Sequence, residues 1–247
     1  MTTFRRAHLR VAAILLCLTG VATTAPAQSA TYDLAGLWLL NESSGQVARD
    51  LSGSVNPGML GSTAGVDAND PSRLALGPLG LRGALSFGGD DFVTVPNAPS
   101  LEPDGVTVVA RVRATAPGPY RYLVAKGALM CETASYGLYT DISGALRFYA
   151  SDGQSFTLSP PAPGVWDGGW HTVRGAYDGT GVSLWIDGGK VGTTPATFTI
   201  GYDLPQTNQL YIGTYAGPCG SPMGFVGDVD GVALIGRYTS GVDGLVG

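Results

Sequence analysis

Alternation of apolar and polar side chains recurs along the chain and predicts β-strands. In residues 106–113, valine or alanine at each even position alternates with Thr, Val or Arg, and residues 182–187 repeat this period of two. Further strands are predicted at 85–87, 93–95, 122–126, 136–140, 145–150, 170–177, 210–213 and 225–235. No segment has a clear 3.6-residue stripe, and 62–80 is interpreted as a surface loop. The pattern predicts an all-β fold, a two-sheet antiparallel β-sandwich or jelly roll.

Composition agrees with short strands and excludes one class of function. The chain has 38 Gly and 16 Pro, and only 13% of its residues are charged, against about 25% in ordinary globular chains. With 44% hydrophobic residues the chain can bury a core. The 14 Lys and Arg against 19 Asp and Glu argue against nucleic-acid binding, which needs a basic face.

The first residues have the features of a secretory signal peptide. Three arginines precede the apolar stretch 11–21, which is too short for a membrane span, and Ala-Pro-Ala at 25–27 supplies a cleavage pattern. We predict a signal peptide at 1–27 and one mature domain at 28–247, with a single-span anchor as the alternative. Removal of 1–27 takes away three basic and no acidic residues, so the net charge of −5 becomes −8. The mature protein is expected to have no membrane span and to be secreted, extracellular or in the cell envelope.

Two cysteines remain after cleavage of the predicted signal. Cys131 and Cys219 both lie in segments rich in small and turn-forming residues. An even pair in an oxidising compartment predicts one disulfide between two loops, and two separate buried thiols are the alternative. No Cys-x-x-Cys pair or Cys/His cluster is present, so a zinc site is not expected.

Five segments, in order, resemble the laminin-G-like domains of the concanavalin A-like lectin/glucanase family. They are 35–45 (AGLWLLNESSG), 50–58 (DLSGSVNPG), 85–96 (LSFGGDDFVTVP), 170–188 (including WHTV, YDG and LWIDG) and 225–232 (FVGDVDGV). The resemblance covers almost all of 28–247. It implies a concanavalin A-like jelly roll formed by a single domain.

The resemblance also implies a structural calcium ion. Many members of the family bind calcium between the Asp-x-Ser-Gly loop and the last strand, which would make Asp50, Asn56 and Asp230 ligands here. Carboxylate, amide and carbonyl oxygens are the ligands that calcium prefers. The alternative is that Asp50 and Asn56 only cap turns through their own hydrogen bonds.

Catalytic patterns are weak in this chain. The family's glucanases carry Glu-x-Asp-x-x-Glu on one strand, and this pattern is absent. His171 is the only histidine in 28–247, lies in a predicted strand, and has no Gly-x-Ser-x-Gly partner motif. We therefore expect a protein that is not an enzyme. A hydrolase or lyase with an unrecognised active site is the alternative.

The favoured function is a secreted, non-catalytic binding module for an extracellular glycan or glycoprotein. A structural or adhesive role at the cell surface is a further alternative. Trp166, Tyr136 and Tyr215 are the candidate ligand-binding residues, because aromatic rings beside polar groups suit sugars. The remaining tryptophans of the mature chain are interpreted as packing anchors of strands, and they are Trp38, Trp170 and Trp185. The sequence predicts neither the ligand nor the oligomeric state.

Overall fold

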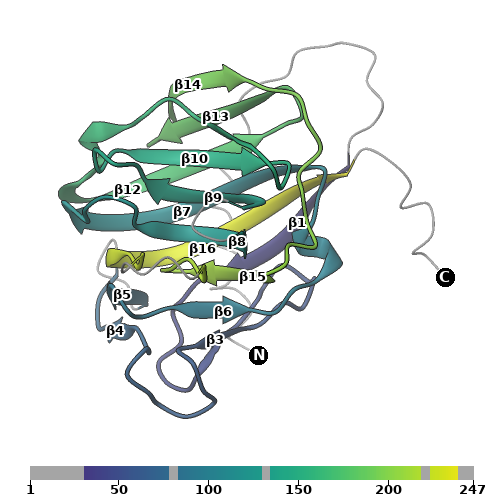
Figure 1. The fold of residues 1–247 in the computed structure, drawn as a ribbon. Coiled ribbons are helices and arrows are strands. Elements are labelled where there is room, and N and C mark those ends of the chain that lie inside the picture. Colours follow the sequence, from purple (N-terminus) through teal and green to yellow (C-terminus); the bar gives the residue numbers. More distant parts are fainter. Residues whose placement is uncertain (1–30, 78–82, 130–133, 218–222, 239–247) are drawn as a thin grey trace. The chain divides into compact units, whose positions relative to one another are not determined.

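A computed structural model describes residues 31–77, 83–129, 134–217 and 223–238. These residues form two eight-stranded sheets, which we call the front sheet and the back sheet (Figure 1). Every pairing between the named strands is antiparallel. The predicted all-β sandwich is therefore confirmed.

The front sheet faces the viewer in Figure 1. Its strand order is β11-β10-β9-β8-β15-β6-β3-β2. The strands are β11 (Phe156–Leu158), β10 (Leu146–Ser151), β9 (Tyr136–Thr140), β8 (Tyr122–Ala128), β15 (Thr207–Ile212), β6 (Val93–Val95), β3 (Gly58–Leu60) and β2 (Val47–Ala48).

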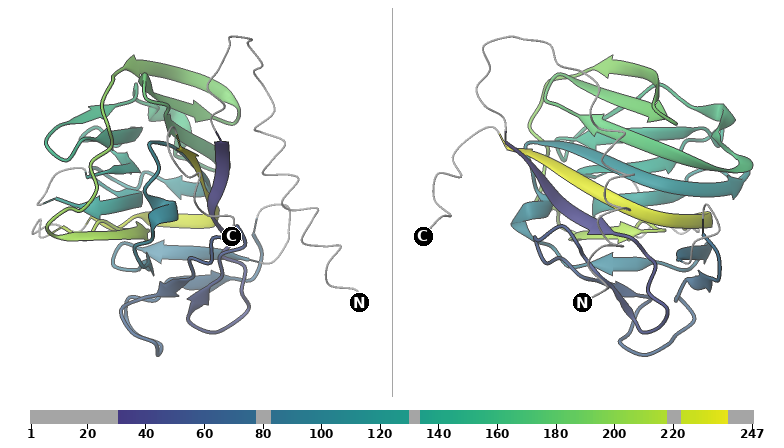
Figure 2. Two further views of the ribbon diagram at one scale, coloured as in Figure 1. Left: turned by 90° about the vertical axis from the view of Figure 1, so that its right-hand side faces the viewer. Right: turned by 180° about the vertical axis from the view of Figure 1, so that it is seen from behind.

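The back sheet has the order β14-β13-β12-β7-β16-β5-β4, and β1 also pairs with β16. The strands are β14 (Gly189–Pro195), β13 (Gly181–Ile186), β12 (Asp167–Tyr177), β7 (Gly105–Thr115), β16 (Val226–Tyr238), β5 (Ala84–Gly88), β4 (Ser72–Leu74) and β1 (Thr31–Trp38). One edge of β16 pairs with β7 along most of its length. Its other edge pairs first with β5 and then with β1, which lie beside it in the rear view of Figure 2.

The core lies between the two sheets and is built by the period-two pattern. Val108 and Val112 of β7 are 0% exposed, as are Phe148 of β10 and Leu210 of β15. Trp38 at the end of β1 is also 0% exposed, and its indole nitrogen donates to the carbonyl of Asn56 at 2.8 Å. The interpretation of Trp38 as a packing anchor is confirmed.

The structure adds strands where the sequence pattern is weak. Residues 72–74 form β4 within the segment interpreted as a loop, and 189–195 form β14 from a run of glycine and threonine. Both are at the ends of the strand order of the back sheet. An edge strand buries little surface, so its sequence needs no regular alternation of apolar residues.

Helical structure is minor in the described residues, where it consists of the 3₁₀ turns η3 (Pro99–Leu101) and η4 (Pro163–Val165). Within that part of the chain we find no helix with the length and apolarity to span a membrane.

Candidate functional site

A groove of about 520 Å³ lies on the outer face of the front sheet, over β3, β6 and β15. Met59, Thr94 and Tyr211 are register neighbours across these strands and form its floor. Leu210, the residue before Tyr211, points inward and is 0% exposed. The alternation that builds the core therefore presents a thioether, a hydroxyl and a phenol ring to the outside. We call this feature the front groove.

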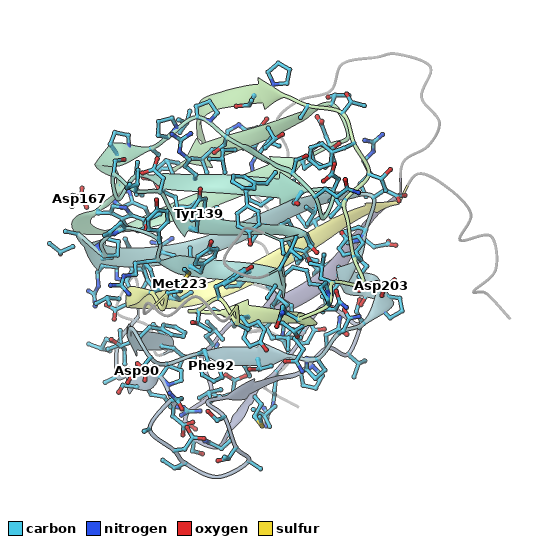
Figure 3. The ribbon with its side chains drawn as sticks, in the orientation of Figure 1. Asp90, Phe92, Tyr139, Asp167, Asp203 and Met223 are labelled. Carbon is cyan, nitrogen blue, oxygen red and sulfur yellow. The ribbon has the colours of Figure 1, made fainter. Side chains whose placement is uncertain are left out.

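Two aromatic rings form the walls of the front groove. Phe92, in the turn before β6, meets Tyr211 edge-on with ring centroids 6.3 Å apart and an interplanar angle of 67°. Figure 3 shows Phe92 and Asp90 together at the lower part of this face. On the other side, the Tyr215 ring lies 4.6 Å from that of Tyr122, and the Tyr215 hydroxyl accepts a hydrogen bond from the Leu129 amide at 2.9 Å. The Phe92 wall is thus held against the floor of the groove, and the Tyr215 wall by contacts outside it.

The polar groups of the front groove are only partly used within the protein. The Tyr211 hydroxyl donates to Gln209 Oε1 at 2.7 Å, and burial raises the pKa of Tyr211, which stays a neutral phenol. Gln209 Nε2, Thr94 Oγ1 and Thr214 Oγ1 have no hydrogen-bond partner among the described residues. Residues that carry an unused amide donor and two unused hydroxyls therefore line a volume that a ligand can fill.

The charge at the front groove is negative. Asp90 lines one end and is exposed. Asp91 beside it accepts a hydrogen bond from the Gly88 amide, and burial, followed by the charge of Asp90, raises the pKa of Asp91. None of the described residues that line the groove is a lysine or an arginine. This chemistry favours an uncharged ligand with hydroxyl groups over an anionic one.

Next to Tyr215, buried tyrosines form a cluster that is separate from the main core and smaller than it. Tyr122, Tyr139 and Tyr149 are at most 5% exposed and pack with Tyr215. The rings of Tyr122 and Tyr139 stack with centroids 5.2 Å apart. Burial raises the pKa of Tyr139 to about 12. This cluster supports the Tyr215 wall and limits the groove to the β3, β6 and β15 side.

A second hollow, of about 310 Å³, lies at one end of the sandwich next to Trp166. It is lined by Pro117, Ile142, Pro163 and backbone of neighbouring turns, and Ile142 is 75% exposed. The Trp166 indole nitrogen donates to the Gly144 carbonyl at 2.8 Å. Its polar atom is therefore engaged in the protein, and the hollow offers fewer side-chain hydrogen-bonding groups than the front groove.

The structure places the three predicted ligand-binding aromatic residues in three different environments. Trp166 lines the end hollow, and Tyr215 lines the front groove although its side chain is buried, at 4% exposed. The prediction that Tyr136 binds a ligand is wrong, because its side chain is 0% exposed and its hydroxyl donates to the Leu101 carbonyl at 2.9 Å. The sequence analysis missed Tyr211 and Phe92. The alternation of Leu210, Tyr211 and Ile212 was the signal that places Tyr211 on the outer face.

The interpretation of Trp170 and Trp185 as packing anchors is also wrong. Both are partly exposed and lie outside the two clusters of buried residues. Arg113 lies over the Trp170 ring and Arg174 over the Trp185 ring. Trp170 and Trp185 occupy the polar phase of their strands, so the alternation turns them away from the core.

The Asp50 loop is a compact hydrogen-bonded turn. Asp50 Oδ1 accepts from the backbone amides of Leu37 and Ser52, and Oδ2 accepts from the Ser52 hydroxyl and the Asn56 amide, at 2.8–2.9 Å. The Asn56 side-chain nitrogen donates to the Ala35 carbonyl and to the Ser100 hydroxyl. A cation would have to compete with four donors for the same carboxylate.

The predicted calcium ligands therefore do not fit a metal ion as they stand. Asp230 lies at the bulge of β16, between Val229 and Gly231. Among the described residues there is no group of three or more His, Cys, Asp or Glu side chains that could hold a metal. The hydrogen bonds of Asp50 favour the turn-capping alternative, and calcium at this loop stays a prediction.

Two further predictions fall on residues that the structure does not describe. Cys131 and Cys219 lie in 130–133 and 218–222, and the predicted signal peptide lies in 1–30. The disulfide and the signal peptide both stay predictions.

Comparison with known proteins gives the family and the fold. Residues 87–241 match the model of Laminin_G_3, a concanavalin A-like lectin/glucanases superfamily. Comparison of the sequence with curated proteins gives no match.

Among solved structures, domain 4 of the extracellular arabinanase AbnA from Geobacillus stearothermophilus, in complex with arabinotriose, is similar with a TM-score of 0.59. The identity is 12%, and the match covers 84% of this chain and 95% of that chain. Botulinum neurotoxin type C, whose cell entry depends on interaction with two ganglioside molecules, matches with a TM-score of 0.57 and 12% identity over 83% of this chain and 48% of that chain. Trypanosoma rangeli sialidase matches with a TM-score of 0.57 and 20% identity over 90% of this chain and 33% of its own. At these identities the likeness shows the fold.

Proposed function

Since the chain belongs to the concanavalin A-like lectin/glucanases superfamily, we propose that it is a non-catalytic carbohydrate-binding module whose glycan occupies the front groove. The proposed ligand is a short, uncharged oligosaccharide of an extracellular glycan or glycoprotein. The arabinotriose held by the similar arabinanase domain makes that sugar the first probe. The likeness of fold alone assigns no ligand.

The observation that carries the proposal is the pairing of aromatic walls with unused polar groups in one hollow. Tyr211 and Phe92 offer ring surface, while Gln209 Nε2 and the threonine hydroxyls offer hydrogen bonds. Sugars present apolar C–H faces and a rim of hydroxyls, which need this combination. The volume of about 520 Å³ lies within the usual range of small-molecule sites.

The non-catalytic role is supported by what the acidic residues already do. Glu102 pairs with the fully buried Lys126, whose ammonium group also contacts Asn97 and the Asn208 carbonyl. Glu42 accepts a hydrogen bond from the backbone amide of Arg49. Neither Glu102 nor Glu42 lines the front groove, and among its described lining residues Asp90 is the one carboxylate. Glu132, the third glutamate of 28–247, lies outside the described residues. Glycoside hydrolysis by the usual route needs two carboxylates.

The test is calorimetric titration with arabinotriose and a panel of neutral oligosaccharides. Tyr211→Ala should weaken binding by about thirtyfold or more, the effect of removing a central interface residue. Phe156→Ala is the matched control, because Phe156 is an aromatic residue of the same sheet, 43% exposed, and lies outside the groove.

Two outcomes contradict the proposal. One is that no sugar of the panel binds at millimolar concentration. The other is that a sugar binds with equal affinity to Tyr211→Ala, Phe156→Ala and the parent. Release of reducing ends or unsaturated products from polysaccharides by the parent would favour the enzymatic alternative. The first candidate would then be His171, whose ring nitrogens contact Asp167 and Asp187.

A further inference from the structure

The outer face of the back sheet carries cations and tryptophans in neighbouring register positions. Trp185 of β13 lies between Lys190 of β14 and Arg174 of β12. Four residues before Arg174 on β12, Trp170 lies beside Arg113 of β7. The strand rise of about 3.3 Å per residue puts these two groups roughly 13 Å apart along β12. This face is turned toward the viewer in the rear view of Figure 2.

Each tryptophan holds a cation in a fixed position. The Arg174 guanidinium lies 3.8 Å from the Trp185 ring centroid, and the Lys190 ammonium lies 5.3 Å from it. The Arg113 guanidinium lies 4.9 Å from the Trp170 centroid. A cation held against a ring loses less freedom when it binds an anion, and this applies most directly to Lys190, whose side chain is exposed.

A further arginine lies between the two tryptophan groups. Arg111 is the register neighbour of Thr172, which separates Trp170 from Arg174 along β12. Arg111 Nε is buried and has no hydrogen-bond partner among the described residues. A buried guanidinium nitrogen without an acceptor is costly unless a ligand or water supplies one. We call Lys190, Trp185, Arg174, Arg111, Trp170 and Arg113 together the basic face.

The charge of this face contrasts with that of the chain. The whole chain has 14 basic and 19 acidic residues, yet four of the basic ones gather here. Asp228 pairs with Arg113 at 2.6 Å, and Asp187 and Asp167 contact His171 at 2.7 and 2.9 Å. Asp230 lies at the bulge of β16, next to Gly231, the register partner of Arg111. The positive charge offered to a ligand is therefore that of Lys190, Arg174 and Arg111, which lie on three strands where an extended anion can cross them.

We propose that the basic face binds an acidic polysaccharide whose carboxylates meet the cations and whose sugar rings pack against the tryptophans. Guanidinium groups bind carboxylates through paired N–H donors, and indole rings bind the C–H faces of sugars. A pleated sheet face suits an extended polymer better than a globular ligand. This surface is separate from the front groove and does not depend on a ligand there.

The test is affinity electrophoresis and calorimetry with polygalacturonate at low salt. Lys190→Gln and Arg111→Gln should each weaken binding by about tenfold, the effect of losing one charge-assisted contact. Arg49→Gln, the loss of an exposed cation on the front-sheet side, is the matched control and should leave binding unchanged. Arg111→Lys keeps the charge and should recover part of the affinity. Melting curves and arabinotriose binding verify that each variant folds.

The proposal is overturned if polygalacturonate fails to bind, or if the control and the basic-face variants weaken binding equally. It is also overturned if a fully methyl-esterified polymer binds as well as polygalacturonate, since the cations would then have no role. Equal affinity for a DNA oligonucleotide would assign the face to any polyanion instead of an acidic sugar. Retained polygalacturonate binding by Tyr211→Ala separates this surface from the front groove.

Discussion

The two outer faces of the sandwich have the same origin and opposite chemistry. On the front sheet, Thr94 of β6 and Tyr211 of β15 face outward, and walls at Tyr215 and Phe92 make a groove whose described lining has no cation. On the back sheet, the outward positions of β7, β12 and β13 hold arginine and tryptophan on an open sheet face. Both sets face out because the alternate positions fill one shared core. The residue types at the outward positions, which the core does not constrain, make the two faces different.

The largest effect is expected at the turn that joins the two sheets. Asp50 links the amide of Leu37 in β1 of the back sheet to the Asn56 amide before β3 of the front sheet. Asp50→Ala removes the acceptor of four hydrogen bonds and should lower the free energy of unfolding by about 2–4 kcal/mol. Urea unfolding of parent and variant measures this loss.

The same experiment with EDTA distinguishes a turn cap from a calcium ligand. If Asp50 only caps the turn, chelator leaves the parent unchanged and the variant loses the same free energy with or without it. If calcium binds there, EDTA lowers the stability of the parent and has little effect on Asp50→Ala, since a ligand stabilises only the state that binds it. Asp152→Ala, in an exposed turn with short-range partners, is a control of smaller effect.

The next largest effect is expected in the salt dependence of binding, which should differ between the two faces. Between about 50 and 500 mM NaCl, the affinity of the basic face for polygalacturonate should fall by about tenfold or more, because screening weakens exposed charge pairs. Affinity of the front groove for a neutral sugar should change by less than about twofold over the same range, because a neutral ligand carries no charge to be screened and the described part of the lining has no cation. Parallel slopes for the two ligands would show that they share one site.

Tryptophan emission offers an independent measure of the same difference. Trp170 and Trp185 belong to the basic face, whereas no tryptophan lines the front groove. Polygalacturonate should therefore shift or quench the emission by about a tenth or more, and a neutral sugar should leave it unchanged. Trp185→Phe should reduce the response to polygalacturonate. A response to the neutral sugar would relocate that ligand from the front groove.

The smallest effect is expected from the histidine of the back sheet. His171 contacts Asp167 through Nε2 at 2.9 Å and Asp187 through Nδ1 at 2.7 Å, so both ring nitrogens donate only in the protonated form. The hydrogen bond to Asp167, then that to Asp187, raises the pKa of His171 above its ordinary value. Its contribution to stability is complete below the unfolded pKa of about 6.5 and is lost as the pH rises through the raised folded pKa.

The measurement is the Tm of parent and His171→Gln between about pH 6 and pH 9. The Tm of the parent should decline slightly more over this range than that of the variant. Equal slopes would mean that the two aspartates do not hold a protonated ring. Neutral-sugar affinity of the front groove should not follow this titration, because His171 lies in β12 of the back sheet.

By itself, the sequence determined the all-β class, most of the central strands and the family. These follow from local rules: a strand buried on one face must alternate, and Trp38 needs a buried partner for its indole nitrogen. The edge strands β4 and β14 were not predicted, because an edge strand buries too little surface to require alternating apolar residues.

Only the tertiary structure decided which aromatic residues are available to a ligand. Tyr136 and Tyr211 are both tyrosines of predicted strands, yet Tyr136 closes the core and Tyr211 lies in the floor of the front groove. Alternation states that neighbours along a strand face opposite sides, but it does not say which side is covered by the other sheet, by a loop or by nothing. That depends on contacts between strands distant in sequence, such as β6 with β15 and β7 with β12. The pairing of distant strands therefore determines both proposed binding surfaces.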